Sequence, residues 1–238
     1  MEGAIYRSSQ KKVFKNGLMA RTILSKKQQA VLSVISSETA ICKYFYLTGG
    51  TALAEFYLQH RFSEDLDFFS EKEFDSQSIS VFLRKNSKKL GIDKIEYQQN
   101  FNRNLFFIYA GSEIIKTEFT FFPFPRIEKK TKRGKLFIDS LTDIAANKIF
   151  TIYQNPRARD FIDLYFIIKK TDWEISDLVK KAKVKFDWHI DPLQLSSKFL
   201  LAKEVRDYPV MIKKIDHKVW QDYFMREAKK LEKRILRP

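Results

Sequence analysis

The stretch Tyr46-Leu47-Thr48-Gly49-Gly50-Thr51-Ala52-Leu53 joins a short apolar run to a glycine pair. The aromatic and apolar run that ends at Leu47 is typical of a buried strand. The glycine pair lets the backbone turn sharply, and a helix is expected from Ala52 to Gln59 with Thr51 as its N-cap. A glycine-rich turn that opens a helix presents backbone N–H groups and the positive end of the helix dipole to an anion. The candidate phosphate-binding residues are therefore Gly49, Gly50 and Thr51.

A second stretch follows at once and reads His60-Arg61-Phe62-Ser63-Glu64-Asp65-Leu66-Asp67-Phe68-Phe69. We expect a strand here, and residues two apart on a strand point to the same face. Asp65 and Asp67 would then project side by side, where their charges repel unless a cation lies between them. Mg²⁺ is commonly held by a couple of carboxylates together with substrate phosphates, so the two stretches together predict a nucleotide–metal site. A solvated edge strand, or Asp65 acting as a cap, is the alternative.

Three strand-like runs are expected next, at Lys94–Gln99, Asn104–Ala110 and Glu113–Phe122, and they should extend the sheet in antiparallel fashion. In the third run, Lys116, Glu118 and Thr120 share one face. Glu118 could complete a trio of carboxylates with the two aspartates, and an ion pair between Glu118 and Lys116 is the alternative.

A helix should begin at Ser140, because Ser140 and Asp143 resemble a capping box. Its apolar stripe includes Lys148, and a buried ammonium is costly unless it meets an anion. A nucleotide phosphate or an active-site carboxylate would serve, and a lysine that reaches solvent along a buried stem is the alternative. On the following helix Asp160 and Asp163 lie on one face, where a structural role in the first turn is equally compatible.

Charge and cysteine content narrow the class of protein. The 238 residues suit one domain, or a compact core with an appended subdomain. The net charge of +15 favours a polyanionic partner, nucleic acid or an anionic membrane. A single cysteine excludes an internal disulfide and a zinc cluster. The sequence shows no signal-peptide pattern and no apolar run near the roughly 18 residues that a membrane span needs, so we expect a cytoplasmic protein.

The remaining pattern is helical and basic. Helices are expected at residues 26–36, 76–90, 175–185, 192–204 and 217–236. Basic residues gather in an N-terminal arm at residues 1–24, which we expect to be loosely held or packed on the domain. They also gather in a loop at residues 129–135, which could contact an RNA backbone, and on the last helix, whose basic face suits a polyanion.

The motif Gly49-Gly50-Thr51-Ala52-Leu53, followed by His60-Arg61-x-Ser63-x-Asp65-Leu66-Asp67-Phe68-Phe69, resembles the nucleotidyltransferase AbiEii toxin family of the polymerase-beta-like nucleotidyltransferase superfamily. The resemblance covers roughly residues 30–225 and includes Lys148 and the later Arg159-Asp160-x-x-Asp163-Leu164. It implies an α+β fold, with a nucleotidyltransferase core built on a small mixed sheet (residues 1–139, with the N-terminal arm) and a helical C-terminal subdomain (residues 140–238).

The same resemblance implies a type IV toxin that uses Mg²⁺ to transfer a nucleoside monophosphate from an NTP to the 3′ end of tRNA, and that a cognate antitoxin protein neutralises. Asp65 and Asp67 would bind the metal, and Lys148 would neutralise phosphate charge. Glu118, or one of Asp160 and Asp163, would act as base or orienting group, and which of these two aspartates matches the family motif stays open. Ser63 and Arg61 would join the nucleotide site, with Arg61 contacting either the triphosphate or the acceptor.

Two other functions remain compatible with the sequence. One is an enzyme of the same fold that modifies a protein or small-molecule hydroxyl, which salt-sensitive binding of tRNA would distinguish. The other is a non-catalytic nucleotide- or RNA-binding module, against which the intact Asp65-x-Asp67 pair argues.

Overall fold

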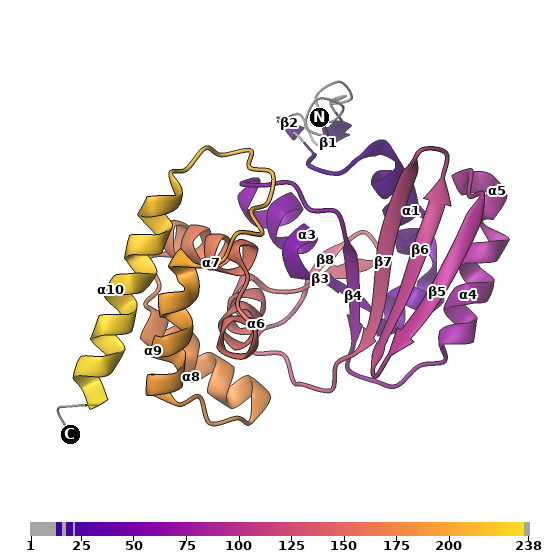
Figure 1. The fold of residues 1–238 in the computed structure, drawn as a ribbon. Helices are drawn as coiled ribbons and strands as arrows, with labels where there is room; N and C mark the ends of the chain where they lie inside the picture. The colour runs from indigo at the N-terminus through magenta and orange to yellow at the C-terminus, as the bar shows by residue number, and fades with distance from the viewer. Residues whose placement is uncertain (1–12, 16–17, 21, 236–238) are drawn as a thin grey trace. The chain divides into compact units, whose positions relative to one another are not determined.

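The computed structural model describes residues 13–15, 18–20 and 22–235, and the chain divides into two compact units (Figure 1). Unit 1 comprises Met1–Phe56, Phe62–Pro123 and Lys132–Ile138, and unit 2 comprises Tyr57–Arg61, Phe124–Thr131 and Asp139–Pro238. These units are defined by packing alone, so the expected domains 1–139 and 140–238 stay a prediction. The basic side chains expected at the chain ends, Lys11, Lys12, Arg21 and Arg237 among them, lie outside the described residues.

A seven-stranded mixed sheet runs through unit 1 in the order β5-β6-β7-β4-β3-β9-β8 (Figure 1). Strands β5, β6 and β7 are antiparallel neighbours, β4 pairs with β7 in parallel and with β3 in antiparallel fashion, and β3 pairs with β9 in parallel. The bounds are β3 (Tyr46–Thr48), β4 (Leu66–Ser70), β5 (Lys94–Asn100), β6 (Arg103–Ala110), β7 (Glu113–Phe121), β8 (Thr131–Arg133) and β9 (Leu136–Ile138). A separate hairpin is formed by β1 (Val13–Lys15) and β2 (Leu18–Ala20).

Two expectations about the sheet need correction. The three runs do form antiparallel hairpins with one another, but β7 joins the rest of the sheet in parallel with β4. The connection between β4 and β7 carries helices and a hairpin, and a connection of that length allows the parallel pairing. The basic stretch 129–135 is not entirely a loop, because residues 131–133 form β8, which pairs with β9.

The helices of unit 1 precede the first strand of this sheet, β3, or lie between its strands in chain order (Figure 1). The first, α1 (Lys26–Ser37), begins with a capping box between Ser25 and Gln28. The helix expected at residues 76–90 is interrupted at Asn86, whose side-chain amide donates to the carbonyl of Phe82. The others are α2 (Thr39–Tyr44), α3 (Gly49–Leu53), α4 (Ser76–Lys85) and α5 (Ser87–Leu90), and the π-helix η2 (Ala54–Leu58) continues α3 into unit 2.

An aromatic core fixes the register of the central strands. Phe68 of β4 and Phe119 of β7 are fully buried and stack with ring centroids 5.1 Å apart, and Phe106 of β6 packs edge-on against Phe119 at 5.9 Å. Burying a phenylalanine contributes about 2–3 kcal/mol. A one-residue slip of either strand would turn these rings to the opposite face. The core therefore also determines which residues lie on that opposite face.

Unit 2 is helical, as predicted, and its helices end within a few residues of the expected positions. They are α6 (Leu141–Gln154), α7 (Ala158–Thr171), α8 (Ile175–Phe186), α9 (Pro192–Leu200), the 3₁₀ turn η3 (Leu201–Lys203) and α10 (His217–Ile235). Phe161, Phe199, Trp220 and Phe224 form a fully buried core among α7, α9 and α10.

A buried ion pair fastens the irregular segment of unit 2 to its helices. Lys185 of α8 donates to Asp143 of α6 at 2.7 Å, and neither side chain is exposed. The same carboxylate accepts the backbone N–H groups of Ile127 and Glu128. A buried carboxylate with this many donors ties residues 124–131 to α6. Within the described part of the chain, no helix has the length and apolar character needed to cross a membrane.

Candidate functional site

One face of the unit 1 sheet gathers the predicted acids, and we call it the carboxylate face. Asp67 of β4 lies directly opposite Glu118 of β7 in the parallel register, and Asp65 immediately precedes β4. Alternate residues of the same strands point into the aromatic core, so these three acids share the other face. The expected grouping of Asp65, Asp67 and Glu118 is thereby present. Strand β4 lies between β3 and β7, and the edge-strand explanation is wrong.

Two basic residues pair with these acids. Lys116 contacts Asp65 through Nζ and Oδ2 at 2.9 Å. Arg103 of β6 donates from Nε and Nη2 to the two oxygens of Glu118, at 2.8 and 2.6 Å, and Thr120 also donates to Glu118 at 2.6 Å. The alternative pairing of Glu118 with Lys116 is therefore not formed. Arg103 went unnoticed in the sequence because only the sheet register brings it beside Glu118.

Glu118 is held as a carboxylate. Only 4% of the residue is exposed, and burial alone would raise its pKa. The hydrogen bonds from Arg103 and Thr120 outweigh burial and leave the pKa of Glu118 below its ordinary value. A bidentate guanidinium favours the charged form of a carboxylate in this way.

The glycine turn packs directly against Asp67. Helix α3 starts at Gly49 and Thr48 is its N-cap, so the expectation that Thr51 caps the helix is wrong. The hydroxyl of Thr51 instead donates to the carbonyl of Asp65. Gly49 has φ +71°, and a Cβ there would lie 2.3 Å from Asp67 Oδ2. The position requires glycine both for its left-handed backbone and for its contact with the carboxylate.

Gly49, Gly50 and Thr51 are the first three residues of α3. The first N–H groups of a helix have no acceptor within the helix, which suits them to an anion. Their assignment to nucleotide binding stays a prediction that this geometry favours.

The loop that leads into β4 is anchored by a buried glutamine. Gln28 of α1 is 4% exposed, and its amide nitrogen donates to the carbonyls of Ser63 and Glu64 at 3.1 and 2.7 Å. Its amide oxygen accepts the N–H of Ser25. The sequence gives no sign of this anchoring role, because Ser63 and Glu64 lie far from Gln28 along the chain. The predicted contact of Ser63 with nucleotide stays a prediction.

The carboxylate face fits a divalent cation held jointly with substrate. Among the residues that the structure describes, no three acidic, histidine or cysteine side chains come close enough to form a cation cage by themselves. Mg²⁺ commonly binds to one or two carboxylates and completes its coordination with phosphates and water. Asp65 and Asp67, beside a turn suited to phosphate, match that donor set.

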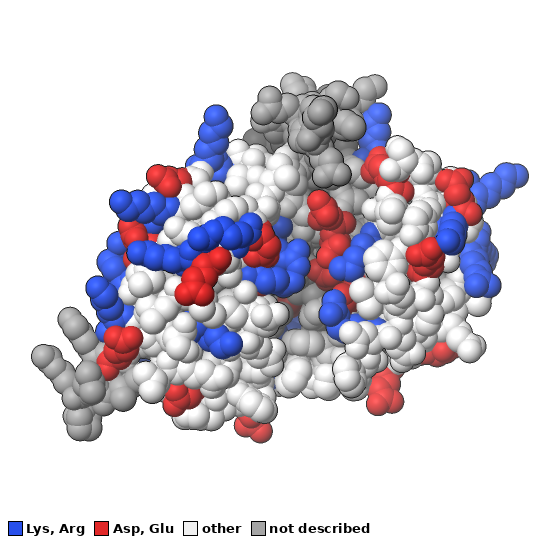
Figure 2. Space-filling model, in the orientation of Figure 1, with Lys and Arg blue, Asp and Glu red and all other residues white. Residues whose placement is uncertain are grey.

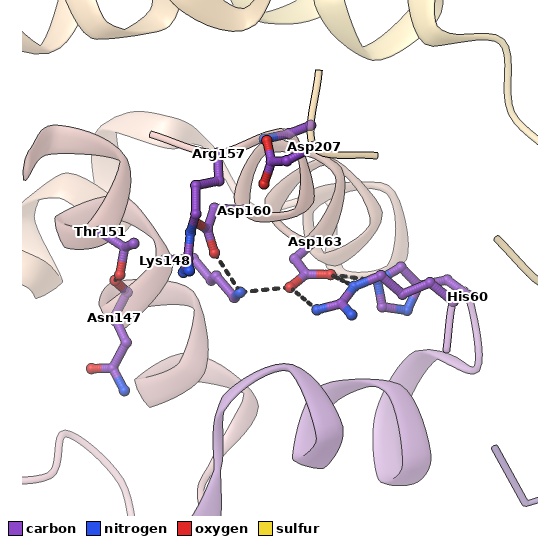
Figure 3. Close-up of polar contacts among 10 residues, drawn as sticks. His60, Asn147, Lys148, Thr151, Arg157, Asp160, Asp163 and Asp207 are labelled. Atoms are coloured by element: carbon purple, nitrogen blue, oxygen red, sulfur yellow. Dashed lines mark hydrogen bonds and ion pairs between the residues drawn. The ribbon is translucent and has the colours of Figure 1, made fainter. Parts of the chain in front are cut away.

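Unit 2 contains a second charged cluster, which we call the Asp163 network (Figure 3). Arg61 donates to both oxygens of Asp163, from Nε at 2.6 Å and from Nη2 at 2.8 Å. His60 Nε2 lies 2.7 Å from the same carboxylate, and Lys148 Nζ reaches it at 2.6 Å. Lys148 also donates to Asp160 at 2.7 Å. Asp163 is fully buried and accepts from three side chains at once.

The pKa values in the Asp163 network follow from burial and these contacts. Burial alone would raise the pKa of Asp163, but Arg61 and Lys148 hold it well below its ordinary value. Burial lowers the pKa of His60 and outweighs the opposing effect of Asp163, so His60 is neutral and donates from Nε2. Its Nδ1 is buried without a hydrogen-bond partner among the described residues.

The network bears on several predicted site residues. The anions that Lys148 meets inside unit 2 are Asp160 and Asp163, the two aspartates of the predicted motif. Arg61 is 4% exposed, and its pair with Asp163 would have to open before it could contact a triphosphate or an acceptor. Catalytic roles for Lys148, Asp160 and Asp163 stay predictions, and the contacts in unit 2 show that all three also have a structural task.

The sequence pattern of a known family extends over most of the chain. The family described as "Nucleotidyl transferase AbiEii toxin, Type IV TA system" matches residues 32–230. This chain belongs to the AbiEii family. It is therefore a nucleotidyltransferase of a toxin family with an α+β fold, and the fold class and resemblance inferred from the glycine turn and the two aspartates are confirmed.

Individual relatives agree with this assignment. A protein of Aquifex aeolicus (strain VF5), "Uncharacterized protein aq_aa25", is 37% identical over 167 residues, which cover 68% of this chain and 76% of that protein. JHP933 from Helicobacter pylori has a similar fold, with a TM-score of 0.57 and 20% identity over 89% of this chain and 94% of its own. MenT4, described as nucleotidyltransferase toxin Rv2826c from Mycobacterium tuberculosis H37Rv, also has a similar fold. Its TM-score is 0.53 and its sequence identity 16%, over 88% of this chain and 86% of its own.

AbiEii membership also establishes the general requirements of the reaction. Nucleotidyltransferases act on a nucleoside triphosphate and generally use divalent metal ions, and a type IV toxin–antitoxin family implies an antitoxin partner.

The first prediction concerns the contact of the turn with Asp67. Gly49→Ala should lower the free energy of unfolding by about 1–3 kcal/mol more than Gly111→Ala does, because its Cβ would push Asp67 aside. Gly111 is the matched control, with φ +66° and open space around its Cβ position. Urea unfolding and a nucleotidyl-transfer assay check this, with transfer lost only in Gly49→Ala. Equal stability and equal transfer in the two variants would contradict the contact.

The second prediction is the pH dependence of stability. The folded-state pKa of His60 lies below its ordinary 6.5, so the unfolded chain binds a proton first and stability falls as the pH drops below about 6.5. Asp163 adds a further loss below its ordinary pKa of 3.8, for the same reason. Urea unfolding measured between about pH 5 and 8 should show that the free energy of unfolding changes less steeply with pH in His60→Gln than in the wild type.

The control for that prediction is His189→Gln, since His189 is exposed. This variant should keep the slope of the wild type. A His60→Gln variant with an unchanged slope would show that His60 is not the group that titrates.

Proposed function

We propose that this protein transfers a nucleoside monophosphate from an NTP to the 3′ end of tRNA, with Mg²⁺ bound at Asp65 and Asp67, and so blocks translation. The observation that carries the proposal is the carboxylate face, where three acids meet a glycine turn that packs against Asp67. In this proposal a separate cognate antitoxin, as expected for a type IV system, neutralises the toxin. The proposed acceptor places the reaction in the cytoplasm.

The proposed reaction is an in-line displacement at the α-phosphorus of the NTP. The acceptor hydroxyl oxygen forms the new bond to phosphorus, the bond to the bridging oxygen of the β-phosphate breaks, and pyrophosphate leaves. Bound Mg²⁺ would neutralise the triphosphate and lower the pKa of the attacking hydroxyl. The protein's own contribution is to position charge, since little covalent work falls to side chains in such reactions.

Each residue of the carboxylate face has a proposed task. Asp65 and Asp67 would hold the metal, and the N–H groups at Gly49 and Gly50 would bind phosphate oxygens, which the start of α3 at Gly49 supports. Glu118 would orient the acceptor hydroxyl or accept its proton. Support for this role comes from its register opposite Asp67 and from its charged state.

The remaining site residues are proposed from the family motifs. Ser63, on the loop that Gln28 anchors, and Thr51 would complete the nucleotide site. Lys148 would neutralise phosphate charge, and Asp160 or Asp163 would act as the motif's aspartate. Asp160 retains the half-exposed Arg157 as an additional partner, whereas Asp163 is enclosed by three donors. Both aspartates are buried, and these contacts leave open which of them matches the motif.

Overall charge favours a nucleic acid as the acceptor. The chain carries 44 basic and 29 acidic residues, a net charge of +15. Figure 2 shows Lys and Arg side chains spread over the surface of both units on the face drawn, with acidic residues among them. A polyanion gains affinity from such a charge through release of its counterions, and a small-molecule acceptor gains little from it.

The third prediction is transfer of label. Purified protein incubated with total tRNA, Mg²⁺ and each α-labelled NTP in turn should label tRNA, and Asp67→Asn should reduce the rate at least about 100-fold, because it removes a charged ligand for the metal. Asp172→Asn is the control: Asp172 is exposed at φ +56° on the C-cap of α7, where asparagine is well tolerated.

Other outcomes would overturn parts of the proposal. Label on a protein or on a small hydroxyl compound, with tRNA unlabelled, would move the acceptor to another class. Nucleotidyl transfer that persists in Asp67→Asn would show that the carboxylate face does not take part in the reaction.

A further inference from the structure

One surface of unit 2 has no role in the proposed chemistry. Residues 204–216 join η3 to α10 without regular secondary structure apart from one bridge, and we call them the Tyr208 loop (Figure 1). A shallow, open groove on this loop is lined by Tyr208, Pro209, Met211, Lys214, Ile215 and Asp216, together with His217 at the start of α10.

The loop is fastened at several points. The carboxylate of Asp207 accepts the N–H of Ala158 at 2.7 Å and so caps α7, whose N-cap residue Arg157 makes no side-chain capping hydrogen bond. The N–H groups of Ile212 and Lys213 both donate to the carbonyl of His60 at 2.9 Å. Met211 forms a bridge with Arg61. A 13-residue segment held in this way keeps a defined shape despite its lack of regular structure.

An aromatic column supports the exposed ring of the loop. Tyr208 is 37% exposed and stacks on His217, with ring centroids 4.0 Å apart and planes 22° apart. Trp220 Nε1 donates to His217 Nδ1 at 3.4 Å, which fixes the histidine ring from below. Trp220 is fully buried and stacks in turn on Phe161 of α7. The ring of Tyr208 is thus held in place before any ligand arrives.

Exposed lysines accompany this ring on the same loop. Lys214 lines the groove and Lys213 precedes it in the chain, and neither forms an ion pair with any described residue. Lys218, also exposed, follows on the first turn of α10. Asp216 is the one carboxylate among the described residues that line the groove, and it accepts the N–H of Lys218 and so serves as the cap of α10.

We propose that the Tyr208 loop is a docking surface for a single-stranded segment of the RNA acceptor, with one base stacked on Tyr208 and phosphates on Lys213 and Lys214. A fixed aromatic face beside unpaired lysines is the combination that binds single strands, because every base has a π-face and every nucleotide a phosphate. An acidic peptide would pair with the lysines but would have no base to stack on Tyr208. The inference rests on the proposed function for the identity of the acceptor as RNA.

The test measures RNA binding without catalysis. The full chain is titrated into a fluorescently labelled single-stranded RNA oligonucleotide, with Mg²⁺ and NTP omitted, and anisotropy is followed at several salt concentrations. Tyr208→Ala should weaken binding about tenfold, the loss of one stacked base, and Tyr208→Phe should bind as the wild type does. A thermal melt of each variant checks that it is folded.

The lysines are tested as a pair against a matched pair elsewhere. The double variant Lys213→Ser and Lys214→Ser should reduce the slope of log affinity against log salt by about 1.4, because each phosphate contact contributes about 0.7 for a single strand. The control is Lys88→Ser with Lys89→Ser on α5, two exposed neighbouring lysines with the same total charge. This control should leave the slope nearly unchanged.

Three results would overturn the inference: unchanged binding by Tyr208→Ala, an equal effect of the two lysine pairs, or competition by a polyglutamate peptide that depends on the lysines but not on Tyr208. The last would assign the surface to an acidic protein. The two proposals can fail separately. Loop-dependent RNA binding without any transfer to tRNA contradicts only the proposed function, and transfer to tRNA with RNA binding and KM unaffected by Tyr208→Ala contradicts only the role of the loop.

Discussion

Like-charge repulsion on one face of a sheet is the constraint on which unit 1 depends. The parallel register of β4 and β7 brings Asp65, Asp67 and Glu118 to the same face. Two unit charges about 4 Å apart repel by about 4 kcal/mol at the effective dielectric of a protein surface, about 20. The chain offsets this with Lys116 and Arg103, which leaves three negative and two positive groups. These five groups sum to a net negative charge, which favours a cation.

In the Asp163 network of unit 2, by contrast, the charges are buried and paired with one another. Asp160 and Asp163 carry two negative charges, Arg61 and Lys148 carry two positive ones, and His60 is neutral. The half-exposed Arg157 adds a positive charge beside Asp160, so each buried carboxylate meets at least two basic side chains. Buried ions are costly to desolvate, and such a cluster persists only where its geometry satisfies every charge. Its contacts fix the arrangement of α6, α7 and the His60–Arg61 segment, whereas the carboxylate face is the surface for which we propose substrate binding.

Local sequence patterns predicted where the acidic residues of the carboxylate face lie, but not the residues that hydrogen-bond or anchor them. Period-two alternation correctly placed Asp67 and Glu118 on one face, because that face is set by the aromatic residues between them. Arg103 and Gln28 escaped notice, since their partners lie far away in sequence and only the sheet register and the packing of α1 bring them together. Thr51 is not the cap because the helix begins three residues earlier than its sequence pattern predicts, at the positive-φ glycine.

The crystallographic position of a bound divalent ion would test most directly whether Asp65 and Asp67 hold the metal. Crystals grown with Mn²⁺ and a non-hydrolysable NTP analogue should show an anomalous-scattering peak between the carboxylates of Asp65 and Asp67, with the triphosphate against the Gly49 turn. The same experiment with Asp67→Asn should lose the peak. Nucleotide bound elsewhere, or a metal peak away from both aspartates, would contradict the assignment of the carboxylate face as the catalytic site.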